Sequence, residues 1–164
     1  MKTRSRLVLM IVALVGLSNT ASFATNYYVD PSSTSTTANG SLAYPWKTIA
    51  QVNSGTTLLN PGDSVFFKRG QSYSGRLTIS RSGSATAPIV YTNYGTGNLP
   101  EFNNAITDII NIYNKQYIVI NGIKIIDNSI STTDHTVQAK ISYAINIENS
   151  PNCTISNCDI SLVG

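Results

Sequence analysis

Residues 109–125, IINIYNKQYIVINGIKI, decide the fold, because residues 144–160, AINIENSPNCTISNCDI, repeat their pattern. Aligned without gaps at an offset of 35 residues, the two segments are identical at six positions. A fixed period between about 20 and 50 residues indicates a repeat architecture. The identical pairs are Ile110/Ile145, Asn111/Asn146, Ile112/Ile147, Asn114/Asn149, Ile120/Ile155 and Ile125/Ile160.

Each copy contains three short apolar runs separated by polar corners that are rich in asparagine. Three short strands per repeat with sharp corners describe one turn of a parallel β-helix. Stacked turns put isoleucine on isoleucine in the core, and they put Asn111 on Asn146 and Asn114 on Asn149 in side-chain amide ladders. Ordinary turn chemistry is the alternative reason for these asparagines, and at the corners both reasons can hold.

The upstream sequence predicts the remaining elements. Apolar runs at 65–67, 77–79 and 89–91, bounded by glycine and serine turns, predict strands, and alone they suit a sandwich or barrel equally well. Pro45 opens a stretch with apolar residues near helical spacing, which predicts a short amphipathic helix over 46–53. The expected fold is therefore all-β, a right-handed parallel β-helix (solenoid) with a short N-terminal capping helix.

The expected divisions of the chain follow from these segments. They are a signal peptide at 1–24, an N-terminal strand, polar loop and capping helix at 25–62, and the first turns of the β-helix at 63–164. Because the second repeat runs to Gly164 without a capping segment, we expect a fragment truncated at its C-terminus, since stacked repeats need covered ends.

The N-terminal segment 1–24 predicts export. Three basic residues within the first six positions precede an apolar core over 7–17, and small residues then follow, with cleavage expected after Ala24. The apolar run is short of the roughly 20 residues that a spanning helix needs. We expect a secreted, periplasmic or cell-surface protein without a membrane span in the mature chain.

The charge balance argues against nucleic acid as a partner. The chain has 11 lysines and arginines against 8 aspartates and glutamates, and three of the basic residues lie in the predicted signal peptide. The mature part is therefore neutral by formal charge. Lys68-Arg69 is its only adjacent basic pair, which is too little to follow a phosphate backbone.

Residues 27–160 resemble the N-terminal region of bacterial secreted right-handed parallel β-helix proteins. The resemblance lies in YYVDP (27–31), PWKTI (45–49), PGDSVFFKRG (61–70), and SGSATAPIVY (82–91) followed by YGTG (94–97). This pectate lyase-like superfamily includes chondroitinase/alginate lyase-like enzymes, related glycoside hydrolases and non-catalytic surface proteins. The resemblance implies a polysaccharide or glycan partner, a helix that caps the end of the β-helix, and lyase working residues on later turns.

Two reaction types follow from the resemblance. A lyase needs a lysine or arginine base and a cation for the uronate carboxylate, often Ca²⁺ held by clustered carboxylates. A hydrolase needs two carboxylates across a cleft. Nothing in the chain predicts a cofactor, so any Ca²⁺ is left to the full-length protein. The sequence offers isolated carboxylates and selects no pair among Asp108, Asp127, Asp134, Glu148 and Asp159.

The polar interval 128–143 separates the two copies, and we expect it to leave the core as a loop. Insertions in solenoids gather on one face, often the binding face. The loop holds the candidate catalytic residues Asp134, His135 and Lys140. Lys140 is the candidate base by position, whereas a lone loop histidine beside an aspartate is more often a solvated surface residue.

Two cysteines and three tyrosines complete the candidates. Cys153 and Cys158 fall at core positions of the repeat, which predicts thiols packed as small apolar residues, with a disulfide after export as the alternative. Tyr73, Tyr94 and Tyr113 are candidates for stacking on sugar rings, with packing as the alternative.

The leading functional hypothesis is the N-terminal part of an exported polysaccharide-active protein. It would be a lyase or glycoside hydrolase acting on acidic or plant or algal cell-wall polysaccharide, and this fragment alone is expected to be inactive. The alternative is a non-catalytic extracellular glycan-binding or adhesion scaffold, because fold does not imply function.

Overall fold

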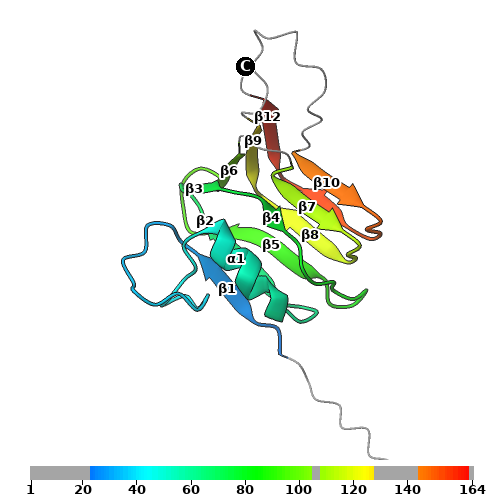
Figure 1. Ribbon diagram of the computed structural model, residues 1–164, viewed down its shortest axis with the longest axis horizontal. Helices are drawn as coiled ribbons and strands as arrows, with labels where there is room; N and C mark the ends of the chain where they lie inside the picture. Colours follow the sequence, from blue (N-terminus) through cyan, green and yellow to red (C-terminus); the bar gives the residue numbers. More distant parts are fainter. Residues whose placement is uncertain (1–22, 105–107, 128–143, 163–164) are drawn as a thin grey trace, which may run out of the picture.

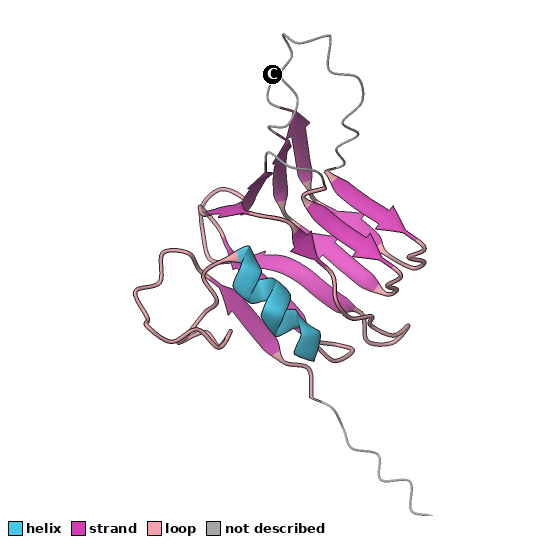
Figure 2. Ribbon diagram, in the orientation of Figure 1, coloured by secondary structure: helices cyan, strands magenta, loops and turns pink. Residues whose placement is uncertain are grey.

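The computed structural model describes residues 23–104, 108–127 and 144–162, in which the protein is mostly β with one short α-helix (Figures 1 and 2). The strands are β1 (Asn26–Val29), β2 (Ser64–Lys68), β3 (Ser72–Ser74), β4 (Leu77–Thr78), β5 (Ile89–Tyr94), β6 (Glu101–Asn104), β7 (Ile110–Tyr113), β8 (Ile118–Asn121), β9 (Lys124–Asp127), β10 (Ile145–Glu148), β11 (Thr154–Ser156) and β12 (Asp159–Leu162). Helix α1 spans Ile49–Gly55 and continues into a 3₁₀ turn at Thr56–Leu58.

The strands form three parallel sheets, here called A, B and C. Sheet A has the order β1-β2-β5-β8-β11, sheet B the order β3-β6-β9-β12, and sheet C the order β4-β7-β10. From β2 onward the chain visits A, B and C in turn, and every strand up to β9 pairs with the strand three places later. We call each set of three successive strands a repeat unit, so that β7–β9 and β10–β12 are the last two units.

The offset found in the sequence is the register of the last two repeat units. Ile110 pairs with Ile145 in sheet C, and the same offset joins β8 to β11 in sheet A and β9 to β12 in sheet B. The predicted amide ladder is confirmed, because the Asn146 side chain donates a hydrogen bond of 3.0 Å to Asn111 Oδ1.

The corner asparagines serve turn chemistry instead. Asn114 and Asn149 occupy the same repeat position with φ of 51° and 48°, and Gly122 and Asn157 match in the same way with 68° and 53°. Asparagine enters this left-handed region more readily than most residues, and glycine enters it freely. Both proposed reasons for asparagine therefore hold, at different positions of the repeat.

Helix α1 begins later than the expected 46–53. Trp46 is extended and forms a parallel bridge with Val29, where it is 5% exposed and its ring stacks on Tyr27 at 5.1 Å between centroids. The helix starts after Thr48, whose hydroxyl accepts a hydrogen bond from the Gln51 N–H, since a threonine in this position caps a helix.

Helix α1 completes the free edge of β4. The side-chain amide of Asn53 donates to Arg76 O at 2.8 Å and accepts from Thr78 N–H at 3.0 Å. These are the two bonds that a neighbouring strand would make, and an unsatisfied edge invites pairing with another chain. The buried Ile49 and Val52 bring the helix into the core cluster.

One hydrophobic cluster joins all three sheets. Phe67 of β2 packs edge-on against Tyr73 of β3 and Phe102 of β6, at 5.2 and 4.9 Å between ring centroids. Strands β3 and β6 were not predicted, because each places a single aromatic residue between polar neighbours. At the outermost strands Ile147 and Ile160 are 45% and 51% exposed, since no further strand among the described residues covers them.

Within the described residues, no helix combines the length and apolar character that a bilayer crossing requires. The predicted signal peptide, apart from residues 23–24, and the loop at 128–143 lie outside the described residues.

Candidate functional site

Three charged residues form a row across sheet B. Glu101, Lys124 and Asp159 are the first residues of β6, β9 and β12, and the register pairs Glu101 with Lys124 and Lys124 with Asp159. Backbone bonds fix the row, since Lys124 N–H donates to Pro100 O at 2.9 Å and Asp159 N–H to Ile123 O at 3.0 Å. One lysine position therefore lies between two acidic positions on adjacent strands, at a strand spacing of about 4.8 Å.

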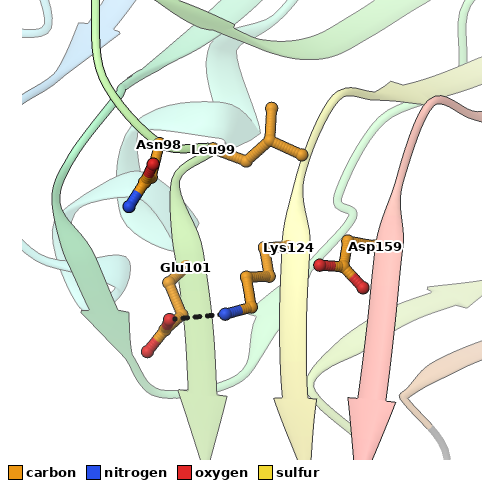
Figure 3. A pocket seen from close by; sticks show the side chains of 5 residues that line it. All are labelled: Asn98, Leu99, Glu101, Lys124 and Asp159. Carbon is orange, nitrogen blue, oxygen red and sulfur yellow. Dashed lines mark ion pairs between the residues drawn. The ribbon is translucent and has the colours of Figure 1, made fainter.

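The row borders a cleft of about 300 Å³, whose lining is completed by Asn98 and Leu99 (Figure 3). Lys124 Nζ lies 3.3 Å from Glu101 Oε2, and these side chains are 32% and 29% exposed. Figure 3 shows Lys124 between Glu101 and the exposed Asp159. Within the described part of the chain Lys124 is paired with Glu101 alone, so a lining with two carboxylates and one ammonium gives this carboxylate cleft a net negative charge.

The corner that precedes Lys124 is held by a chain of hydrogen bonds. Arg69 donates through Nη1 to Asn93 Oδ1 and through Nε to Gly97 O, both at 2.9 Å. The Asn93 amide in turn donates to Gly122 O at 2.8 Å. The position of Lys124 in the cleft therefore depends on a buttressed corner just before it in the chain.

The carboxylate cleft has the size and groups to bind a small polar ligand. Its volume lies at the small end of the range of about 300–1,000 Å³ for ligand pockets. Ionised carboxylates are strong acceptors for hydroxyl donors, and an ammonium supplies three donors. Its net negative charge favours a neutral ligand over an anionic one.

A second cleft of about 340 Å³ lies at the corner between β7 and β8. Ser82 Oγ accepts from Gln116 N–H at 3.2 Å, and Ser150 Oγ accepts from Lys115 N–H at 3.1 Å, so both neighbouring repeat units hold this corner. We call it the amide cleft, and Lys115 is the only charged residue in its described lining. It is lined by Ser82, Asn114, Lys115, Gln116, Asn149 and Pro151.

The carboxylates named as candidates from the sequence lie in different places in the structure. Asp159 joins the carboxylate cleft, whereas Asp108 forms an ion pair with Arg76 at 2.8 Å and Glu148 is exposed on β10. Asp127 pairs through its backbone with Leu162, so it does not stack on Asp159. Among the described residues, no three or more histidine, cysteine, aspartate or glutamate side chains could together hold a metal ion.

The loop candidates Asp134, His135 and Lys140 lie outside the described residues. Glu101 and Lys124 were not predicted as site residues. The offset between the two sequence repeats alone would have placed Lys124 opposite Asp159. Glu101 carried no such signal, because its separation from Lys124 in the sequence differs from that offset.

The three tyrosines also differ. Tyr73 is 2% exposed and its hydroxyl lies 3.1 Å from both Val29 O and Lys68 O, so it is a packing residue. Tyr94 is half-buried with its ring edge-on to Tyr28 at 5.2 Å. Tyr113 is 48% exposed on β7 and remains open to a ligand.

The two cysteines are free thiols, each partly buried against the core cluster. The predicted packing role is therefore confirmed for the described structure, in which they are not bonded to one another. Burial raises the pKa of the Cys153 thiol. A thiol in that state is less reactive than an exposed one.

No family model matches the chain, and no curated protein sequence matches it. Among solved structures, the chain is similar to a GH136 lacto-N-biosidase from Eubacterium ramulus, with a TM-score of 0.65 and 18% identity over 83% of this chain. It is also similar to a rhamnogalacturonan lyase, with a TM-score of 0.61 and 19% identity over 86% of this chain. The chain spans 27% and 38% of the length of these two proteins. At such identities the likeness establishes the fold alone.

Proposed function

We propose that the chain belongs to an exported, polysaccharide-active protein built on a right-handed parallel β-helix, whose faces are sheets A, B and C. The repeated A–B–C order and the parallel pairing of every third strand support this reading. Crossovers between parallel strands of one sheet are right-handed in about 98% of cases, which supports the hand. The two similar structures, a lacto-N-biosidase and a rhamnogalacturonan lyase, support a saccharide as the ligand.

The observation that carries the proposal is the row of Glu101, Lys124 and Asp159 in the carboxylate cleft. Glu101 and Asp159 accept hydrogen bonds from the hydroxyls of one neutral sugar residue, and Lys124 donates to a ring or hydroxyl oxygen. Leu99 offers an apolar surface to the sugar ring. In a hydrolase the two carboxylates would act as acid and base, and in a lyase Lys124 would be the candidate base.

The amide cleft adds a second subsite of different charge. Lys115 and three side-chain amides suit a uronate residue, since an ammonium pairs with the carboxylate and amides bond the hydroxyls. The two clefts lie beyond opposite ends of β8, which is four residues long. A strand of this length spans roughly 13 Å. Together the clefts favour an oligosaccharide that contains both neutral and acidic residues.

Calorimetric titration with oligosaccharides tests the proposal. Rhamnogalacturonan fragments, neutral galactose oligomers and galacturonate oligomers are titrated into the protein, with Ca²⁺ or with chelator. Binding of mixed neutral and acidic oligomers that weakens in Lys124→Met supports the proposal, and no binding of any of these saccharides contradicts it. New absorbance from an unsaturated product would identify a lyase. New reducing ends without that absorbance would identify a hydrolase, and binding without cleavage would identify a glycan-binding module.

A further inference from the structure

Asp63 is a buried carboxylate next to the end of the predicted signal peptide. The residue is 1% exposed. Its Oδ2 accepts a hydrogen bond from Asn60 N–H at 2.8 Å, and its Oδ1 accepts one from Thr25 N–H at 2.7 Å. Within the described part of the chain, no lysine or arginine forms an ion pair with Asp63.

Burial costs a carboxylate its solvation, which a well-placed cation offsets in addition to neutral N–H donors. Removal of residues 1–24 would change one of those donors. The peptide nitrogen of Thr25, which already points at Asp63 Oδ1, would become a terminal amine and would be protonated at neutral pH. Thr25 is held in place independently, since its carbonyl accepts a hydrogen bond from Ser64 N–H at 2.9 Å.

We propose that processing after Ala24 completes this site, by placing the new α-ammonium group of Thr25 in an ion pair with the buried carboxylate of Asp63. Hydrolysis breaks the Ala24–Thr25 peptide bond. The hydroxyl of the water goes to the Ala24 carbonyl carbon, which becomes a carboxylate, and the two protons of the water end on the Thr25 nitrogen as –NH₃⁺. The exported protein is thereby stabilised over its precursor, because β1 follows directly at Asn26 and is anchored at its first residue.

The site has one other titratable neighbour. Burial, and after it the charge of Asp63, raises the pKa of the Tyr27 phenol. Tyr27 therefore stays neutral in the pH range where an α-amine titrates. An ion pair with Asp63 favours the charged form of the amine and raises its pKa above the usual value of about 7.7–8.0.

The experiment uses the full chain, exported from a bacterial host that processes it. Mass spectrometry reads the mature N-terminus, and reductive methylation follows the reactivity of the α-amine from pH 7 to 10. The matched variant carries one extra alanine inserted after Ala24, so that its mature amine lies one residue away from Asp63. We expect wild-type protein to begin at Thr25, to melt several degrees above the variant, and to be methylated at its α-amine roughly tenfold more slowly at pH 8.

Asp63→Asn provides the second comparison, and it is expected to bring the labelling rate of the wild-type N-terminus up to that of the insertion variant. If Asp63→Asn does not fold, the wild-type and insertion proteins still decide the question. A mature N-terminus other than Thr25, or equal labelling rates and melting temperatures in the two proteins, would overturn the proposal. The result does not depend on which saccharide the protein binds.

Discussion

The side-chain amide of Asn93 donates a hydrogen bond of 2.8 Å to Gly122 O, and the same nitrogen occupies the space that a Cβ on Gly122 would need. Gly122 has φ of +68° at the corner between β8 and β9. The Asn93 side chain, from the preceding repeat unit, therefore leaves no room for a side chain at position 122 and also holds the Gly122 carbonyl in place. Gly122 lies two residues before Lys124.

Gly122→Ala is expected to destabilise the protein by about 2–3 kcal/mol. The left-handed conformation costs a non-glycine residue about 1–2 kcal/mol, and displacing the Asn93 amide removes a hydrogen bond worth about 1 kcal/mol. Urea unfolding measures the change. The matched control is Gly95→Ala, where φ is +80° but nothing lies within 4 Å of the new Cβ. Equal losses in the two variants would contradict the role given to Asn93.

Asn53→Ala is expected to cost about 1–3 kcal/mol, because it leaves Thr78 N–H and Arg76 O at the edge of β4 without their partner. Thermal unfolding of this variant is compared with that of Ser54→Ala, an exposed neighbour in the same helix. If both variants melt alike, the Asn53 amide does not complete the sheet edge.

Stability is expected to fall at acid pH through Asp30. Burial alone would raise the pKa of this carboxyl, but hydrogen bonds from Lys68 and Ser32 outweigh it and the pKa lies below its ordinary value of 3.8. A lowered pKa adds stability above the unfolded-state value, and that stability is lost as the pH falls through the folded-state value. The difference in unfolding free energy between wild type and Asp30→Asn should therefore be constant near neutral pH and shrink below about pH 5. A difference that grows on acidification would contradict this assignment.

Lys124→Met is expected to weaken saccharide binding about tenfold, which corresponds to the loss of one charged hydrogen bond. It also leaves Glu101 without its ion-pair partner. Arg76→Gln is the control, because Arg76 forms an ion pair with Asp108 and does not line either cleft. Titration calorimetry gives both affinities. A similar loss in the two variants would indicate a general charge effect.

The repeat was predictable because the last two units keep one offset. Ile110 and Ile145, or Ile125 and Ile160, are found by sliding the sequence over itself, and the structure pairs them in that register. Earlier units do not keep that spacing. Ser64 pairs with Val90 in sheet A, whereas Ser72 pairs with Glu101 in sheet B, so the upstream units carry no common period.

For the same reason, most residues of the carboxylate cleft could not be predicted from the sequence. Glu101 meets Lys124 only because the corner lengths of two units place both at the start of a strand. The sequence likewise gives no sign of the edge contact of Asn53, since no pattern marks a single asparagine in a short helix as a partner for β4. The polar loop at 128–143 was predicted to hold the site because of its residue types, whereas the described cleft is built from strand positions that lie far apart in the sequence.

The most direct test of the saccharide site is a ¹H–¹⁵N correlation spectrum of the protein titrated with rhamnogalacturonan fragments. We expect the largest shift changes on the backbone amides of Glu101, Lys124 and Asp159, with a second group at Lys115 and Gln116. Lys124→Met should remove the first group and leave the second. Saturable binding that leaves the amides of β6, β9 and β12 unmoved would contradict the assignment of the carboxylate cleft.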